Sequence, residues 1–335
     1  MRNTTIVLVQ VHKRLENLRY LVSSLRAVKD IERAVVVFSH DFWDPDINLF
    51  VRNITAFRVM QMFFPYSIQL YPHVFPGRDP QDCSWNTNTS KALQQACQNA
   101  KWPDSYGHYR EASYTQIKHH WWWKIHRARG LPGGGPYVSP DLLHALTLLQ
   151  RLRPALCPAC QVLALGNYNK LSPRIYKNFV ERGDWWVNKY NLGFAMDASL
   201  WSRLTKCKDK FCHFDDYNWD WTMTNVVQTC LPQRLLMLSV RLTRVLHLGS
   251  CGTHVRKKGC DVKAEVRNAV SRFASSREWL FPETLALQGS WKSSGKPKRG
   301  NGGWGDYRDR QLCLAIGNHT ADEATLGRLQ GMRSS

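Results

Sequence analysis

Residues 215–221 (DDYNWDW) are the densest group of carboxylates in the sequence, and aromatic residues alternate with them. Aromatic rings can stack on the faces of sugars, and an aspartate beside a hydroxyl can accept its proton while the hydroxyl attacks. An inverting sugar transfer needs one such base. The same composition fits an acidic loop beside buried tryptophans equally well, so these residues suggest a sugar site that other features must support.

Basic side chains elsewhere could complete such a site. Residues 12–14 (HKR) directly follow an apolar run and could bind a diphosphate through charge-assisted hydrogen bonds. His247 ends another strand-like run and could ligate a metal ion, although a single histidine is more often only hydrogen-bonded. His119 and His120 are neighbours in a predicted helix, where adjacent side chains diverge by roughly 100 degrees. They therefore fit substrate donors or a packed helix better than a shared ion.

A β-α-β pattern near the N-terminus predicts where the basic residues lie. Residues 4–10 and 34–38 have the composition of buried strands, and apolar residues recur at helical spacing over 15–28 between them. The short connections predict parallel strands. Because ligands of open α/β sheets bind at the carboxyl ends of strands, residues 10–14 and 39–41 should face one crevice.

The rest of the chain alternates between predicted elements and polar segments. We expect strands at 57–64 and 162–165, a less secure strand at 68–71, and helices at 113–126 and 141–151. A polar loop should span 76–106, and the Gly/Pro-rich residues 129–136 show no apolar periodicity. These patterns predict a catalytic domain over 1–289, followed by a loop or tail at 290–335 that packs back partly through Cys313.

Composition narrows the possible functions. The net charge of +20 favours a phosphate-bearing partner such as a nucleic acid, an anionic membrane or a nucleotide sugar, although a solvated basic surface explains it as well. Of the 14 tryptophans, most should belong to the core. The even number of cysteines, ten, and the glycosylation sequons at Asn53, Asn88 and Asn318 argue against nucleic-acid binding.

The cysteines indicate an oxidising compartment. The sequence contains a single Cys-x-x-Cys pair, at Cys157 and Cys160, where a zinc site would need a second pair or spaced histidines. The pair also precedes an apolar strand, whereas a thioredoxin-type pair follows one. We therefore interpret all ten cysteines as disulfides of an exported protein. Because no stretch is long enough to span a membrane and no signal peptide opens the chain, we expect a membrane anchor that this sequence lacks.

Eight segments together resemble the α-1,6-mannosyl-glycoprotein 2-β-N-acetylglucosaminyltransferase family, also called N-acetylglucosaminyltransferase II. They lie in the family's order and span nearly the whole chain: residues 10–14, 38–43, 67–72, 107–112, 118–124, 215–221, 281–285 and 301–306. The resemblance implies a Rossmann-like α/β fold of the GT-A type, with a mixed central sheet flanked by helices and stapled by disulfides. It also implies a Golgi membrane protein with a lumenal catalytic domain.

The activity implied by this resemblance is an inverting transfer of N-acetylglucosamine (GlcNAc). The donor would be UDP-GlcNAc, the acceptor the 2-hydroxyl of the α1,6-arm mannose of an N-glycan on glycoproteins, and the cofactor Mn²⁺. Asp220 would be the catalytic base and His247 a metal ligand. The nucleotide sugar would be held by Gln10, Val11, His12, Lys13, Arg14, Asp41, Gln116, Ile117, Lys118, His119 and His120. The implied disulfides are Cys83–Cys97, Cys157–Cys160, Cys207–Cys230, Cys212–Cys313 and Cys251–Cys260.

One segment departs from the family pattern. After the triple tryptophan the family has a longer segment that ends in an apolar strand and a Glu-Glu-Asp motif, whose last carboxylate binds the metal. Here no Asp or Glu lies between Trp121 and Pro140. We therefore expect the strand near 125–137 and the metal carboxylate to be missing, and the activity to be impaired. A mispredicted exon boundary would account for this, and the alternative function is a degenerate member that only binds UDP-sugar or glycan.

Overall fold

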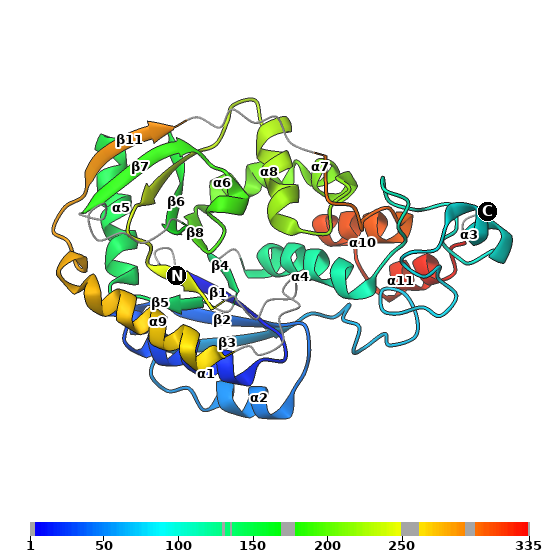
Figure 1. Ribbon diagram of the computed structural model, residues 1–335, viewed down its shortest axis with the longest axis horizontal. Helices are drawn as coiled ribbons and strands as arrows, with labels where there is room; N and C mark the ends of the chain where they lie inside the picture. The colour runs from blue at the N-terminus through cyan, green and yellow to red at the C-terminus, as the bar shows by residue number, and fades with distance from the viewer. Residues whose placement is uncertain are drawn as a thin grey trace.

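The computed structural model describes residues 4–128, 131–134, 136–168, 178–248, 261–291 and 299–333, without the side chains of 131–136 and 291. Two larger sheets and a two-stranded one, with helices around them, form the described structure (Figure 1). The first contains, in spatial order, β3 (Arg58–Phe63), β2 (Val35–His40), β1 (Ile6–Val11) and β4 (Leu131–Gly134). The second contains β11 (Ala286–Trp291), β7 (Phe179–Asp184), β9 (Leu236–Val240), β6 (Cys160–Gly166) and β8 (Gly193–Met196).

The predicted β-α-β unit is confirmed. β1, α1 (Leu15–Arg26) and β2 follow one another, and β1 and β2 are parallel with Gln10 opposite Ser39. α2 (Pro45–Arg52) leads on to β3, which is parallel to β2. Leucines and valines of α1 pack on β1 and β2 because they recur at helical spacing on one face. The carboxyl ends of these parallel strands therefore form one rim.

The expectation that a strand near 125–137 is missing is wrong. Leu131–Gly134 form the short edge strand β4, parallel to β1 with Val9 opposite Gly133. Backbone pairing does not require apolar side chains, and a proline is tolerated in a strand at the edge of a sheet. β4 also lies beside β8, so the expected single sheet is two sheets that meet there. The acidic motif of the family nevertheless has no counterpart in this strand.

Helices and short strands link the two sheets. α5 (Leu142–Leu156) packs on β6, and β5 (Pro136–Val138) pairs antiparallel with β10 (Val245–His247). Near them lie α6 (Ala198–Thr205) and α9 (Val262–Ser275), together with the 3₁₀ helices Ile31–Arg33, Val187–Lys189 and Arg277–Trp279. The predicted strand at 68–71 is wrong, because these residues form a turn next to the rim. Among the described helices, none is long and apolar enough to cross a membrane.

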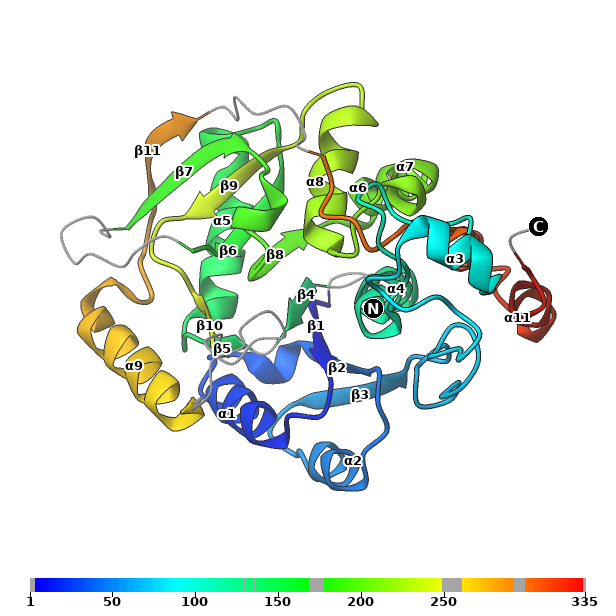
Figure 2. The same ribbon diagram turned by 45° about the vertical axis from the view of Figure 1, so that its right-hand side comes forward.

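The central helix α4 (Ala112–Ala128) is buried along most of its length. Trp121, Trp122 and Trp123 all belong to the main core, which supports the interpretation that most tryptophans are structural. α4 packs against α7 (Lys208–His213), α8 (Trp219–Thr229) and α10 (Tyr307–Asn318), and Figure 2 shows α4 beneath α7 and α8. Its environment is therefore formed by residues far apart in the sequence.

The C-terminal region is not the predicted loop or tail. α10 and α11 (Glu323–Gln330) contribute Leu312, Ile316 and Leu326 to the same core as the tryptophans of α4. Residues 301–303 approach the loop 76–106 so closely that a Cβ at Gly302, whose φ is +79°, would lie 2.4 Å from Asp104 Oδ2. The domain boundary at 289 stays a prediction.

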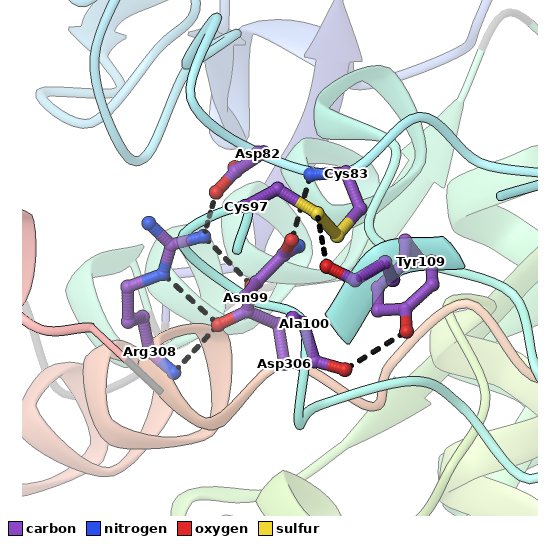
Figure 3. The surroundings of a disulfide bond; sticks show 9 residues. Asp82, Cys83, Cys97, Asn99, Ala100, Tyr109, Asp306 and Arg308 are labelled. Carbon is purple, nitrogen blue, oxygen red and sulfur yellow. Dashed lines mark hydrogen bonds and ion pairs between the residues drawn. A yellow bond between two sulfur atoms is a disulfide. The ribbon is translucent and has the colours of Figure 1, made fainter. Parts of the chain in front are cut away.

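Four disulfides confirm the pairing that the resemblance implied. Cys157–Cys160, Cys207–Cys230 and Cys212–Cys313 are formed, and so is Cys83–Cys97, which joins the segments before and after α3 (Thr89–Gln95) within the loop 76–106. The predicted pair Cys251–Cys260 lies outside the described residues. Around Cys83–Cys97, Arg308 reaches from α10 to Asp82, so the loop is also held by charge (Figure 3).

Candidate active site

A cavity of about 560 Å³ opens at the carboxyl ends of β1 and β2. The predicted residues that line it are Gln10, Val11, His12, Lys13, Arg14, Asp41, Gln116, Ile117 and His247. Residues from other elements complete it: Asn17 and Leu18 of α1, Phe42, Ile68, Gln69 and Arg78 from loops, Ser113 of α4 and Trp219 of α8. The structure thus brings most of the predicted nucleotide-sugar residues and the predicted metal ligand into one place.

Asp41 is the centre of the polar contacts on this rim. Its Oδ1 lies 2.6 Å from His12 Nδ1, and its Oδ2 accepts a hydrogen bond from Gln116 Nε2 at 3.2 Å. Burial would raise the pKa of Asp41, but the hydrogen bond from His12 and the nearby His120, 3.7 Å away, outweigh burial and hold the pKa well below its usual value. Asp41 is therefore an ionised carboxylate whose two oxygens are both occupied by protein groups.

Buried lysine fixes the orientation of a second rim residue. Lys124 Nζ donates to Gln10 Oε1 at 2.6 Å from below the cavity. Burial lowers the pKa of Lys124 to about 7, although the charge of Asp41 raises it. Since the carbonyl oxygen of the Gln10 side chain is held by Lys124, its amide NH₂ is the group left to donate to a ligand.

The structure does not bring the rest of the predicted α4 residues to the cavity. Lys118 is fully buried, and its Nζ donates to the carbonyl oxygens of Phe214 and Asp216 at 3.0 and 2.9 Å. His119 contacts Asp309 at 3.0 Å on another face of the helix. His120 lies behind Asp41 and shares a 2.8 Å hydrogen bond with Ser39 Oγ. These three side chains hold neighbouring elements in place, and their predicted contact with a nucleotide sugar stays untested.

The acidic segment divides into structural carboxylates and one that is less constrained. Asp216 is buried and accepts hydrogen bonds from Asn218 and Asn301, while Asp215 accepts from the backbone amides of Ser105 and Trp304. Both therefore tie distant segments together.

Asp220 is the third carboxylate, in the first turn of α8. Its oxygens accept from Asn191 Nδ2 at 2.7 Å and from the backbone amide of Trp221 at 2.9 Å. Burial raises the pKa of Asp220 despite these two hydrogen bonds, which is the direction that suits a general base.

The neighbours of Asp220 line two different cavities. Trp219 lines the rim cavity, whereas Tyr217, Asn218 and Trp221 line an aromatic groove of about 650 Å³, and Ser113 lines both. The groove is completed by Trp85, Asn86, Glu111, Tyr114 and Asn301. Its aromatic and carboxamide side chains can stack on sugar rings and hydrogen-bond to hydroxyls. The residues on either side of Asp220 thus line a basic cavity and a groove suited to a sugar.

The residues present do not fit a manganese site. Across the described part of the chain, no group of three or more His, Cys, Asp or Glu side chains could hold a metal ion. His247 is the predicted ligand, and burial lowers its pKa, which keeps it neutral. Manganese favours carboxylate, carbonyl and water ligands, and Asp41 is already engaged by His12 and Gln116. The prediction of Mn²⁺ therefore finds no ligand set here.

Fold and site together define a Rossmann-like α/β protein with an anion-accepting cleft at the ends of its parallel strands. The sequence model of the N-acetylglucosaminyltransferase II family matches residues 1–129 and 134–313. The chain therefore belongs to the N-acetylglucosaminyltransferase II family. The two matched stretches omit residues 130–133, where the sequence departs from the family pattern.

Several relatives carry the name α-1,6-mannosyl-glycoprotein 2-β-N-acetylglucosaminyltransferase. The chain is 40% identical to that of Sus scrofa over 324 residues and 39% identical to that of Homo sapiens over 325, covering 92% of this chain and 72% of each relative. It is 30% identical to that of Arabidopsis thaliana over 336 residues, 93% of this chain and 74% of the relative. A solved structure of S. aureus TarS reaches a TM-score of only 0.35 at 11% identity, over 82% of this chain and 73% of that one.

Proposed function

We propose that this chain transfers GlcNAc from UDP-GlcNAc to the 2-hydroxyl of the α1,6-arm mannose of an N-glycan, with inversion at the anomeric carbon. The observation that carries the proposal is that Trp219 and Trp221, on either side of Asp220, line the basic rim cavity and the aromatic groove. Family membership and the names of the relatives support the same donor and acceptor.

The proposed reaction assigns one task to each part of the site. The rim cavity binds the UDP portion, and the aromatic groove binds the mannose arm. Asp220 accepts the proton of the mannose 2-hydroxyl as its oxygen bonds to the anomeric carbon of GlcNAc. The bond from that carbon to the diphosphate breaks, and its electron pair leaves with UDP. Lys13 and Arg14 lie where they can stabilise the charge that develops on the leaving diphosphate.

The substitution Asp220→Asn tests this assignment. It keeps the shape of the side chain but removes the proton acceptor, so we expect the transfer rate to fall by about 10²–10⁴-fold. UDP affinity should change little, because Asp220 does not line the rim cavity. The matched control is Asp209→Asn, on the exposed side of α7, which should keep wild-type turnover. Near-normal transfer by Asp220→Asn would refute the role of this carboxylate.

The alternative is a family member that binds UDP-sugar or glycan without turnover. Assays of transfer and binding with the wild-type protein distinguish the two. GlcNAc transfer to a mannose-terminated acceptor, with the new linkage located at O2 by NMR, would support the enzyme. Saturable binding of UDP and acceptor with no product would favour the alternative. The transfer activity of the enzyme should also depend on pH. It should fall as pH drops through the raised pKa of Asp220, since the base must be deprotonated.

We also propose a location in the Golgi lumen, held at the membrane by an anchor. The disulfides support an oxidising compartment. The sequon asparagines Asn53, Asn88 and Asn318 are all exposed, as glycan attachment requires. A shift to lower mass after enzymatic removal of N-glycans from the protein expressed in a eukaryotic secretory host would support this proposal, and the absence of N-glycans at all three sites would count against it.

A further inference from the structure

We propose that this chain holds the diphosphate of its nucleotide with its own basic side chains, without a divalent metal ion. The proposal rests on the proposed function, since it concerns how the same rim cavity binds UDP. It departs from the Mn²⁺ that the family resemblance implies. Three observations carry it: the carboxylates that the cavity lacks, the cations that it has, and the state of Asp41.

Carboxylates are scarce around the rim cavity. Asp41 is the one carboxylate among the described residues that line it, and protein hydrogen bonds occupy both of its oxygens. The sequence has no Asp or Glu between Glu111 and Asp141, and none within residues 249–260 that follow His247 and Leu248. A hard divalent cation needs several oxygen ligands, and a neutral imidazole beside an engaged carboxylate provides a poor site for one.

Cations, in contrast, are abundant at the same cavity. Lys13, Arg14 and Arg78 all line it, and their side chains are exposed. Within the described ranges none of the three forms an ion pair or a side-chain hydrogen bond, although Lys13 Nζ lies 3.9 Å from the centroid of the Phe42 ring. Guanidinium groups bind phosphate oxygens in pairs of parallel hydrogen bonds, which a diphosphate can accept at either phosphorus.

The scarcity of carboxylates and the abundance of cations favour direct binding of the diphosphate over binding through a metal ion. A divalent cation placed among Lys13, Arg14 and Arg78 would be repelled by three positive charges, whereas a diphosphate would be attracted by all of them. Lys13, Arg14 and Arg78 can therefore neutralise the diphosphate directly, without a metal ion. The cost of this solution is a stronger dependence on ionic strength, because exposed charges are screened by salt.

A two-residue metal site is the competing arrangement that the structure offers. His247 and Glu265 of α9 both line a neighbouring cavity of about 400 Å³, and the negative charge of Glu265 opposes the burial that lowers the pKa of His247. If a cation bound here, Glu265 would replace the carboxylate of the family motif. The experiment must therefore separate binding by Lys13 and Arg14 from binding through His247 and Glu265.

The test is calorimetric titration of the full chain with UDP, in EDTA and then with added Mn²⁺. We expect the Kd for UDP in EDTA to lie within about twofold of its value with Mn²⁺. The double substitution Lys13→Gln/Arg14→Gln should weaken UDP binding by about tenfold to a hundredfold, and Arg78→Gln by a smaller factor. Arg26→Gln, at an exposed arginine at the far end of α1 and outside the cavity, is the matched control and should leave the Kd unchanged.

Each other outcome overturns the proposal in a recognisable way. UDP binding that requires Mn²⁺ and is lost in Glu265→Gln would replace it by the two-residue metal site, and the proposed function would stand. Tight binding in EDTA that ignores Lys13→Gln/Arg14→Gln would show that these cations do not hold the diphosphate. If UDP binds under neither condition while thermal melts show a folded chain, the nucleotide site itself fails, and the proposed function fails with it.

Discussion

Two groups of positive charges in this molecule have opposite environments. Around the rim cavity, Lys13, Arg14 and Arg78 are exposed and have no carboxylate partner in the described structure. Beneath the loop 76–106, Arg110 and Arg308 are buried, and aspartates pair with both. Unpaired exposed cations leave a site able to take an anion, whereas paired buried cations hold segments together. The net charge alone cannot tell the two groups apart.

Substitutions in the buried group of paired arginines should change the free energy of unfolding. Asp309 is fully buried and accepts from Arg110 Nε at 2.9 Å, with His119 at 3.0 Å. Asp309→Asn would remove the closer counter-charge of the buried Arg110 guanidinium and leave it only Asp82, at 3.8 Å, which we expect to lower the free energy of unfolding by about 3–5 kcal/mol. Denaturant unfolding at neutral pH measures this effect. The UDP affinity of the folded variant should stay near that of the wild type. A loss of UDP binding without a loss of stability would contradict a purely structural role for the buried group.

A third environment keeps a buried basic side chain neutral, and its effect on stability should appear at low pH. Burial, with a smaller effect of the nearby His319, lowers the pKa of His126 to about 4. Its ring packs edge-on against Trp122 at a centroid distance of 4.3 Å. Because the unfolded chain binds this proton near pH 6.5 and the folded chain does not, the free energy of unfolding should fall as pH drops from about 6.5 to 4.

His126→Phe isolates the contribution of His126. Phenylalanine keeps the aromatic packing but cannot take up a proton, so the loss of stability between pH 6.5 and 4 should be smaller in the variant by roughly 2–3 kcal/mol. Other buried histidines titrate in both proteins and cancel in the difference. Identical pH dependence of denaturant unfolding in the two proteins would contradict a neutral buried His126.

Local patterns predict much of the fold, but they do not predict the neighbours of α4. The β-α-β unit follows from strand and helix periodicities within some forty residues. α4 is different, because Lys118, His119 and Lys124 are buried beside tryptophans, and no amphipathic pattern indicates which face meets the cavity. The sequence also gives no reason to place Ile68, Gln69 and Arg78 at the rim, since loops bring them there. Four disulfides were predictable only through the family resemblance.

A substitution at Lys124 tests the link between the two regions, since this buried cation reaches the rim through Gln10. Lys124→Met removes the hydrogen bond that orients the Gln10 amide, and the loss of about 1 kcal/mol corresponds to UDP binding that is about fivefold weaker. Because the pKa of Lys124 is about 7, wild-type affinity should depend on pH around neutrality, and the variant should lose that dependence. A melting temperature that falls without any change in UDP affinity would make Lys124 purely structural.

The smallest effect is expected for an ion pair that belongs to neither group. Arg267 and Asp261 lie at the start of α9, 3.6 Å apart, with side chains 71% and 60% exposed. Exposed pairs of this kind contribute about 0–1 kcal/mol, so Arg267→Gln should change the free energy of unfolding by less than about 0.5 kcal/mol. Asp261 instead has a local task, because its Oδ1 caps α9 by accepting from the amide of Ala264 at 3.0 Å. Asp261→Ala should therefore lower the free energy of unfolding by about 1 kcal/mol, whereas Arg267→Gln should hardly change it. Equal losses from the two substitutions would mean that the ion pair, and not the cap, stabilises this helix.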